Sequence, residues 1–431
     1  MSSPGVAVAA GQRSQLLVAL VFLVFFTISF LTNILGPLVP DIISGFHVSL
    51  AMAAVLPFSF FIAYGVMSIP AGFLVEAWGE KRLMVAAFLA GAAGALAFVL
   101  SPRYPVAIAS LFVMGCGMAA LQVAINPLLR VAGGEEHFAF NSAFAQLVFG
   151  AASFASPLVY SWLVGQLGAA PVADGAIVHL LRGVTPAALP WLSIYWLFAA
   201  GTLLMAVFIG LLRLPVVERT GDESAGTLDM YRQLARSRAT WLYLVAIIAY
   251  VGCEQGSSLW ISEFLYRYHG YDPHVQGAAA VSRFWGLMTV GCLGGMLLLK
   301  LYDSRRVLAF FCVGALLMLT LGLFGTARVA YYALPAIGLF ASVMWPTLVS
   351  LALNSVRSHH GPFAGILCSG IMGGALVPLL IGRLGDAFGL RTGMLVLYVT
   401  FGYVLGVAFW ARPLVANATL SQRKATMEGA T

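Results

Sequence analysis

The sequence predicts an all-α membrane protein in which twelve transmembrane helices form two six-helix bundles around a central cavity. Hydrophobic residues make up 61% of the 431 residues and charged residues only 9%, whereas soluble domains have about 25% charged residues. Twelve apolar runs have the length of a membrane span, and one polar stretch divides them into two sets of six. We expect no separate soluble domain.

The spans follow from runs of about 20 predominantly apolar residues. Those of the first half are predicted near residues 15–40, 51–75, 83–101, 105–128, 141–165 and 190–212. Those of the second half are predicted near residues 240–267, 277–299, 307–326, 329–354, 363–384 and 393–411. The first run lacks a small-residue cleavage site, so we interpret it as an uncleaved span rather than a signal peptide.

The polar stretch between the sixth and seventh spans predicts a linker between the halves. Its TGDESAG core is typical of a flexible segment, and an amphipathic pattern from Leu228 to Arg238 predicts a short helix. The predicted segments are a tail at 1–13, a bundle at 14–212, the linker at 213–238, a bundle at 239–412 and a tail at 413–431.

Positive charges predict the orientation in the membrane. If the N-terminus is cytoplasmic, most of the 23 Lys and Arg residues lie at the inner ends of the spans. We therefore expect both termini in the cytoplasm and the protein in the plasma (inner) membrane. This bias explains the net charge of +7, so we infer no nucleic-acid partner from it.

Enzyme and metal-site patterns are absent from the sequence. There is no H-E-x-x-H, G-x-S-x-G or P-loop motif, and the five cysteines form no C-x-x-C pair. We expect buried free thiols, no cofactor, no metal site and no enzymatic activity.

Two carboxamides share one helical face in the stretch GCGMAALQVAINPLLR. Gln122 and Asn126 lie four residues apart, and within hydrocarbon such groups must face protein or a watery cavity. We predict that they face a central cavity and bind a neutral solute. The alternative is that they hold neighbouring helices together by hydrogen bonds.

An acid in the seventh predicted span is a second candidate. Glu254 shares a stripe with Tyr250, Ser257 and Ser258, whereas Gln255 lies off that stripe. A buried acid within a span indicates a functional site, although Glu254 could instead form a structural pair with Arg283. Glu263 lies near the outer end of the span, four residues before Arg267, and predicts a surface ion pair with it.

The loop AGFLVEAWGEKRLM resembles the Gly-x-x-x-Asp-Arg-x-Gly-Arg-Lys motif of the major facilitator superfamily. The resemblance rests on Gly72, Gly79, Lys81 and Arg82, with Glu76 in the acidic position. It implies a cytoplasmic gate that pairs across the two halves and breaks as they rock. The alternative is that the loop has no gating role and is charged only because cytoplasmic loops are rich in Lys and Arg.

A narrower resemblance covers most of the chain. The segments AINPLL, YVGCE, FWGLMTVG, MWPTLVSLAL and GILCSGIMGGALVPLLIGRLGD are similar to the fucose and glucose/galactose permease branch. That branch implies import of a monosaccharide coupled to protons or sodium, with acids in the first and fourth spans. This chain has Asn33 and Gln122 at those positions.

The fifth and eighth spans also differ from the branch. Gln146 matches a sugar contact, but Phe149 replaces an Asn and Cys292 replaces an Arg. Tryptophans such as Trp285 and Trp345 can pack on a sugar ring or simply fill space. The predicted substrate-binding residues are Asn33, Gln122, Asn126, Gln146, Tyr250, Glu254, Ser258 and Trp285.

We therefore expect a transporter that moves a small, mostly neutral solute, a monosaccharide above all, by alternating access. Carboxamides do not titrate, so Glu254 is the predicted coupling residue for a proton or sodium ion. Uniport, export of a more apolar metabolite or drug, and a non-transporting sensor remain alternatives. The resemblance implies a monomer in the lipid bilayer.

Overall fold

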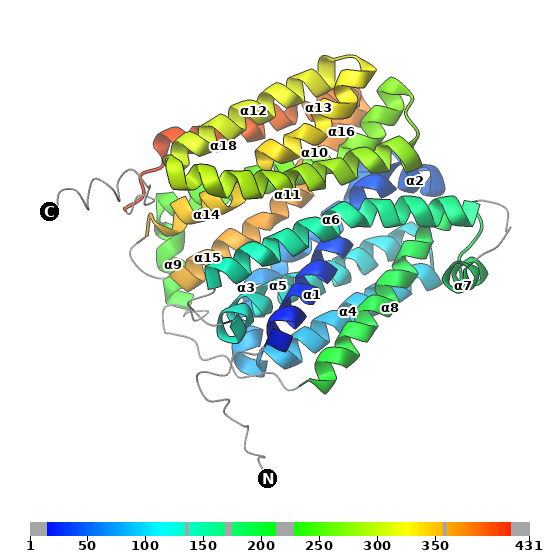
Figure 1. The fold of residues 1–431 in the computed structure, drawn as a ribbon, viewed down its shortest axis with the longest axis horizontal. Coiled ribbons are helices and arrows are strands. Elements are labelled where there is room, and N and C mark those ends of the chain that lie inside the picture. Colours follow the sequence, from blue (N-terminus) through cyan, green and yellow to red (C-terminus); the bar gives the residue numbers. More distant parts are fainter. Residues whose placement is uncertain (1–14, 134–137, 169–174, 213–227, 357–359, 415–431) are drawn as a thin grey trace, which may run out of the picture.

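The computed structural model describes residues 15–133, 138–168, 175–212, 228–356 and 360–414. Within these residues, twelve helices or broken helices are long and apolar enough to cross a membrane, which confirms the predicted spans. The described residues contain no strand. The protein is a multi-pass membrane protein of two six-helix bundles (Figure 1).

The first bundle fills the lower part of Figure 1. It contains α1 (Gln15–Thr32), α2 (Leu35–Phe46), α3 (Leu50–Trp78), α4 (Glu80–Leu100), α5 (Tyr104–Gly133), α6 (Phe138–Gly168), α7 (Ala176–Val184), the 3₁₀ turn η2 (Pro190–Leu192) and α8 (Ser193–Leu211). Its interior is formed where α5 packs on α3 and α4, and where α4 packs on α8.

The second bundle fills the upper part of the same view. It contains α10 (Arg238–His269), the π-helical turn η3 (Pro273–Gly277), α11 (Ala278–Leu301), α12 (Ser304–Phe324), α13 (Ala327–Ala341), α14 (Met344–Leu353), α15 (His360–Ser369), the 3₁₀ turn η4 (Gly370–Met372), α16 (Gly373–Phe388), α17 (Leu390–Met394) and α18 (Val396–Trp410). Helix α10 packs on both α16 and α18.

Two spans are broken by proline at the same spacing. A proline ring removes one amide donor and clashes with the carbonyl of the residue four positions earlier. Pro37 lies four residues after Asn33, where α1 ends, and Pro346 lies four residues after Ser342, where α13 ends. The helices of the first and tenth spans are therefore interrupted at Asn33 and Ser342.

Two short helices lie outside the spans. Helix α9 (Leu228–Arg236) is the expected amphipathic linker helix, and the next helix begins at Arg238. Helix α7, in the loop before the sixth span, had not been expected from the sequence. The predicted N-terminal tail, the TGDESAG core and all but the start of the predicted C-terminal tail lie outside the described residues.

The start of α1 and the end of α18 lie at the same end of the molecule, as an even number of spans requires (Figure 1). We call this the inner end, and the opposite end, where α7 lies, the outer end. Close contacts join the bundles near the outer end. The Ser161 hydroxyl donates to the His274 carbonyl, and Asp41 lies 3.5 Å from the His274 imidazole.

Candidate functional site

A cavity of about 730 Å³ lies between the two bundles. Residues of α1, α3, α5 and α6 line one wall, and residues of α10, α11 and α14 line the other. The lining includes Leu353 and Asn354, where α14 ends near the inner end, while the Ser161 contact with His274 joins the bundles at the outer end. The cavity therefore extends toward the inner end.

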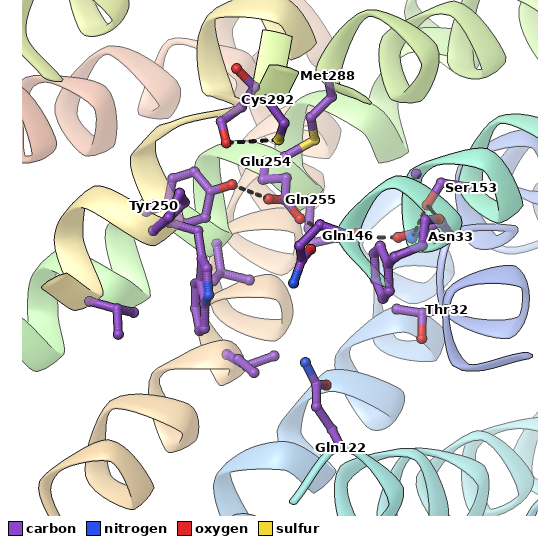
Figure 2. A pocket seen from close by; sticks show the side chains of 18 of the residues that line it. Thr32, Asn33, Gln122, Gln146, Ser153, Tyr250, Glu254, Gln255, Met288 and Cys292 are labelled. Atoms are coloured by element: carbon purple, nitrogen blue, oxygen red, sulfur yellow. Dashed lines mark hydrogen bonds between the residues drawn. The ribbon is translucent and has the colours of Figure 1, made fainter. Parts of the chain in front are cut away.

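The helix break at Asn33 forms the polar part of the first wall. Asn33 is 3% exposed, and its Nδ2 donates to the Ser153 hydroxyl at 2.8 Å. The hydroxyls of Ser29 and Ser153 lie 2.6 Å apart, and Ser29 donates to the Phe149 carbonyl at 2.5 Å. These bonds join α1 to α6 and fix the Asn33 side chain beside the cavity (Figure 2).

Glu254 forms the acidic part of the second wall. Its carboxylate accepts a hydrogen bond from the Tyr250 hydroxyl and another from Gln255 Nε2 at 3.0 Å. Tyr250 is buried and also packs against Trp345, with ring centroids 6.2 Å apart. Glu254 is not paired with Arg283, whose guanidinium donates to the Tyr331 hydroxyl at 2.5 Å. The alternative of a Glu254–Arg283 structural pair was therefore wrong.

Gln255 connects the two walls. Its Nε2 lies 3.0 Å from Glu254 Oε1 and 3.5 Å from Asn33 Oδ1. The sequence interpretation had placed Gln255 off the functional stripe, which was wrong. Helix α10 presents Tyr250, Val251, Glu254 and Gln255 to the cavity, an arc wider than one i, i+4 stripe. Figure 2 shows Tyr250 and Glu254 across the cavity from Asn33 and Ser153.

Three further predicted residues line the cavity, namely Gln122, Gln146 and Trp285. In Figure 2, Gln146 lies between the two walls and Gln122 lies at the bottom of the view. Trp285 is 3% exposed, and its indole N–H has no protein acceptor.

Ser258 does not line the cavity as predicted. Ser258 is buried outside the cavity lining, and its hydroxyl donates to the Gln255 carbonyl at 3.4 Å. It lies one turn beyond Glu254, where α10 contacts α2: a Cβ on Gly36 would stand 2.7 Å from the Ser258 carbonyl. The side chain of Asn126 lies outside the described residues.

The positions that differ from the permease branch also line the cavity. Phe149 forms part of an apolar surface with Phe25, Ile28 and Phe61. Cys292, at the position of the branch arginine, donates its thiol to the Ser342 carbonyl at 3.3 Å. Pro346 has no N–H to donate to the Ser342 carbonyl, so the helix break leaves this acceptor without its usual partner. The Cys292 thiol donates to it instead.

Glu263 is paired with Arg267 as predicted, but only the arginine lies at the surface. Glu263 is only 2% exposed, whereas Arg267 is 41% exposed. The sequence indicated the i, i+4 pairing but not the helices that cover Glu263. Among the described residues, no group of three or more His, Cys, Asp or Glu side chains could hold a metal ion.

The predicted gate residues lie where the second span turns into the third. Gly72 and Glu76 belong to α3, and Lys81 and Arg82 lie in the first turn of α4. Gly79 joins the two helices with φ of 79°, a conformation that favours glycine.

Helix α9 lies beside this gate. Burial, above all, and the charge of Glu76 raise the pKa of Tyr231 in this helix. The rings of Tyr231 and Phe73 have centroids 6.2 Å apart, and the Tyr231 hydroxyl would lie 3.4 Å from a Cβ on Gly365 in α15. The linker helix thus contacts both bundles at the inner end.

Comparisons with known proteins agree with this architecture. The family model described as the Major Facilitator Superfamily matches residues 21–371. A glucose/galactose transporter of Brucella abortus is 31% identical over 396 residues, covering 89% of this chain and 90% of that protein. An L-fucose-proton symporter of Escherichia coli is 26% identical over 404 residues, covering 88% and 90%.

Solved structures show the same fold. The E. coli fucose:proton symporter aligns with a TM-score of 0.67 and 21% identity, covering 93% of this chain and 100% of that one. A bacterial homologue of the human lysosomal transporter Spinster, in an inward-facing conformation, aligns with a TM-score of 0.76 and 14% identity, covering 94% and 98%.

Proposed function

Because the chain belongs to the major facilitator superfamily, in the branch of glucose/galactose and fucose permeases, we propose that it carries a monosaccharide or sugar-like solute by alternating access. The protein is a transporter and not an enzyme. The observation that carries the substrate proposal is the cavity of about 730 Å³ between the bundles, with carboxamides on one wall and an acid and tryptophans on the other.

The polar groups of the cavity suit a hydroxylated, uncharged solute. A carboxamide can both donate and accept hydrogen bonds, and so can a hydroxyl group. The side chains of Asn33, Gln122 and Gln146 therefore suit a solute rich in hydroxyl groups. Trp285 lines the cavity, and its indole ring provides a flat apolar surface for the C–H face of a sugar ring. The predicted binding role of these residues rests on this match.

Glu254 is the proposed site of proton coupling. Relatives of this chain include L-fucose-proton symporters, and a carboxyl group is able to take up and release a proton. Asn33 and Gln122 cannot do so, whereas Glu254 lines the cavity and is hydrogen-bonded to Tyr250 and Gln255. Sodium is the alternative coupling ion.

A more apolar solute is the second candidate, and one observation favours it. Phe25, Ile28, Phe61 and Phe149 form an apolar surface on the first wall. Such a surface suits export of a less hydroxylated metabolite or drug. A sensor that binds its ligand without transporting it would need the same cavity.

We further propose that both termini face the cytoplasm and that the protein works as a monomer in the inner membrane. The bias of Lys and Arg toward the inner end supports this orientation. The cavity then faces the cytoplasm, and the close contacts at the outer end face the periplasm, so the conformation is inward-open.

Uptake into liposomes tests these assignments. Purified protein is reconstituted, and entry of labelled glucose, galactose and fucose is measured with and without an imposed pH gradient. We expect gradient-driven accumulation, which Glu254→Gln abolishes and Gln122→Ala only weakens. Equal uptake with and without a gradient indicates uniport, and binding without uptake indicates a sensor. Normal gradient-driven accumulation by Glu254→Gln refutes the coupling role.

A further inference from the structure

The loop motif of the inner gate occurs a second time in the chain. GFLVEAWGEKRLM at 72–84 and GRLGDAFGLRTGM at 382–394 share a glycine, a leucine, an alanine, a second glycine and a methionine at equal spacing. Both also have an acid, Glu76 or Asp386, three residues before the second glycine, and a base, Lys81 or Arg391, two residues after it. The first copy joins the second and third spans, and the second copy joins the eleventh and twelfth.

The two copies have the same backbone geometry. Gly79 has φ of 79° and ψ of 159°, and Gly389 has φ of 86° and ψ of 147°. Each glycine closes one helix through a 2.9 Å bond to the carbonyl four residues earlier, and the next helix begins after it. The copies lie at opposite ends of the molecule because facilitator bundles contain repeats of inverted topology. The second copy is therefore an outer counterpart of the inner gate.

Asp386 already makes a contact between the bundles. Its Oδ1 accepts the amide of Leu50 at 2.9 Å, and its Oδ2 accepts the amide of Ala51 at 2.9 Å. These are the first two amides of α3, which have no partner within the helix and carry its partial positive charge. Asp386 belongs to the second bundle and α3 to the first, so this carboxylate caps a helix of the opposite bundle.

Small residues on α16 allow this approach. A Cβ on Gly382 would stand 2.9 Å from the Leu50 carbonyl oxygen, and a Cβ on Gly385 would stand 3.0 Å from the Leu50 side chain. The first distance is too short for an unaltered interface, and the second would require the Leu50 side chain to shift. The glycines at these positions therefore keep the end of α16 close enough for Asp386 to reach the α3 amides.

We propose that Asp386 is the latch of the outer gate and that it alternates with Glu76, the latch of the inner gate. Helix α3 runs antiparallel to α15 and α16, so its outer start faces Asp386 and its inner end, with Glu76, faces the start of α15 at His360. In the inward-open state Asp386 caps α3. When the bundles rock, that cap breaks, and Glu76 caps the first amides of α15, which a helix cannot pair within itself. The proposal rests on alternating access but not on the identity of the solute.

Hydrogen–deuterium exchange of the reconstituted full-length protein, without solute, tests the latch. Asp386→Ala removes the cap, and a lost helix cap corresponds to about a tenfold change in a conformational equilibrium. We expect the amides of residues 50–54 to exchange about tenfold faster, and those of 345–356, beside the inner cavity, to exchange more slowly. Glu76→Ala should have the opposite effect on both segments. The double variant should return both rates toward the parent values, since each state loses its latch.

Asp303→Ala is the matched control. Asp303 Oδ1 accepts the Arg305 amide at 2.9 Å and caps α12 within its own bundle. Its loss should leave the exchange of 50–54 and 345–356 unchanged. If Asp386→Ala does not fold, Gly382→Ala serves instead, because its methyl group must separate α16 from α3 and should cause the same opposed changes. Faster exchange of both segments, or no change in 345–356, would overturn the proposal.

Discussion

Gln255 of the seventh span and Asn33 of the first meet across the cavity, with Gln255 Nε2 3.5 Å from Asn33 Oδ1. The same nitrogen donates to Glu254 at 3.0 Å, and Asn33 in turn donates to Ser153 at 2.8 Å. One series of hydrogen bonds therefore joins the only acid lining the described cavity to the opposite bundle.

Breaking this series should uncouple solute movement from the proton gradient. In Gln255→Ala we expect gradient-driven accumulation to fall about fivefold, the value of one hydrogen bond, while exchange of solute at equilibrium persists. Asn33→Ala should have a similar effect. If both act through their mutual contact, the double variant is no worse than either single one; additive losses would show independent roles.

Glu254 should determine the pH response of transport. Solute exchange by the parent protein should vary with pH, because a carboxyl group binds a proton in one part of the cycle. In Glu254→Gln this dependence should vanish while exchange continues, since glutamine does not titrate. The measurement is equilibrium exchange of labelled sugar from pH 5 to pH 8, and Asp303→Asn, at an inner loop, provides a control. An unchanged pH profile would contradict the assignment.

Phe149 should decide how hydroxylated the preferred solute is. Its side chain lines the cavity, so Phe149→Asn exchanges an apolar surface for a donor and an acceptor. In competition assays we expect the affinity for hexoses, relative to that for deoxy analogues, to rise about fivefold, because one added hydrogen bond contributes about 1 kcal/mol. Phe144→Asn on the same helix is the control, because Phe144 packs on Phe22 outside the cavity. Equal effects of both variants would exclude a direct contact.

Close packing in the first bundle should make Gly115 intolerant of a side chain. A Cβ there would meet the Phe60 carbonyl and stand 2.9 Å from the Ala63 methyl group. Gly115→Ala should therefore lower stability by about 1–3 kcal/mol and lower the apparent melting temperature in detergent. Gly165, also helical, has open space around its Cβ position, so Gly165→Ala should not destabilise. Equal melting temperatures of the two variants would contradict the packing argument.

The Glu263–Arg267 pair should be structural. Removing Arg267 leaves a buried carboxylate without its partner, which should cost about 1–3 kcal/mol. Arg267→Ala is therefore expected to melt below the parent, and adding Glu263→Gln should recover part of the loss. The control is Arg232→Ala, since Arg232 and Asp229 are both more than two-thirds exposed and such pairs contribute little. A failure of Glu263→Gln to recover any stability would refute the role of the charge.

Local sequence patterns accounted for much of this architecture. Hydropathy located the spans, and the i, i+4 spacing linked Tyr250 to Glu254 and Glu263 to Arg267. The spacing of Gln122 and Asn126 predicted that Gln122 faces a cavity, and the resemblance to the permease branch added Asn33; Gln122 and Asn33 both line the cavity. Features that depend only on spacing within one helix can be predicted from the sequence of that helix.

Contacts between the bundles could not be predicted in this way. The role of Gln255 depends on Asn33, which is 222 residues away, and the burial of Ser258 depends on its contact with Gly36. Asp386 reaches Leu50 only because α16 lies against α3. Such features follow from how two bundles dock in one conformation, and no local periodicity encodes that arrangement.

The proline breaks at Asn33 and Ser342 separate the path of the backbone from the chemistry of the side chains at the bends. The bends arise from the rings of Pro37 and Pro346, whose effect on the backbone does not depend on which side chain occupies the bend. A side chain with an amide, a carboxyl or a hydroxyl group can occupy either position without altering the bend. A single substitution at Asn33 or Ser342 can therefore change the polar group beside the cavity while the bend in the helix stays intact.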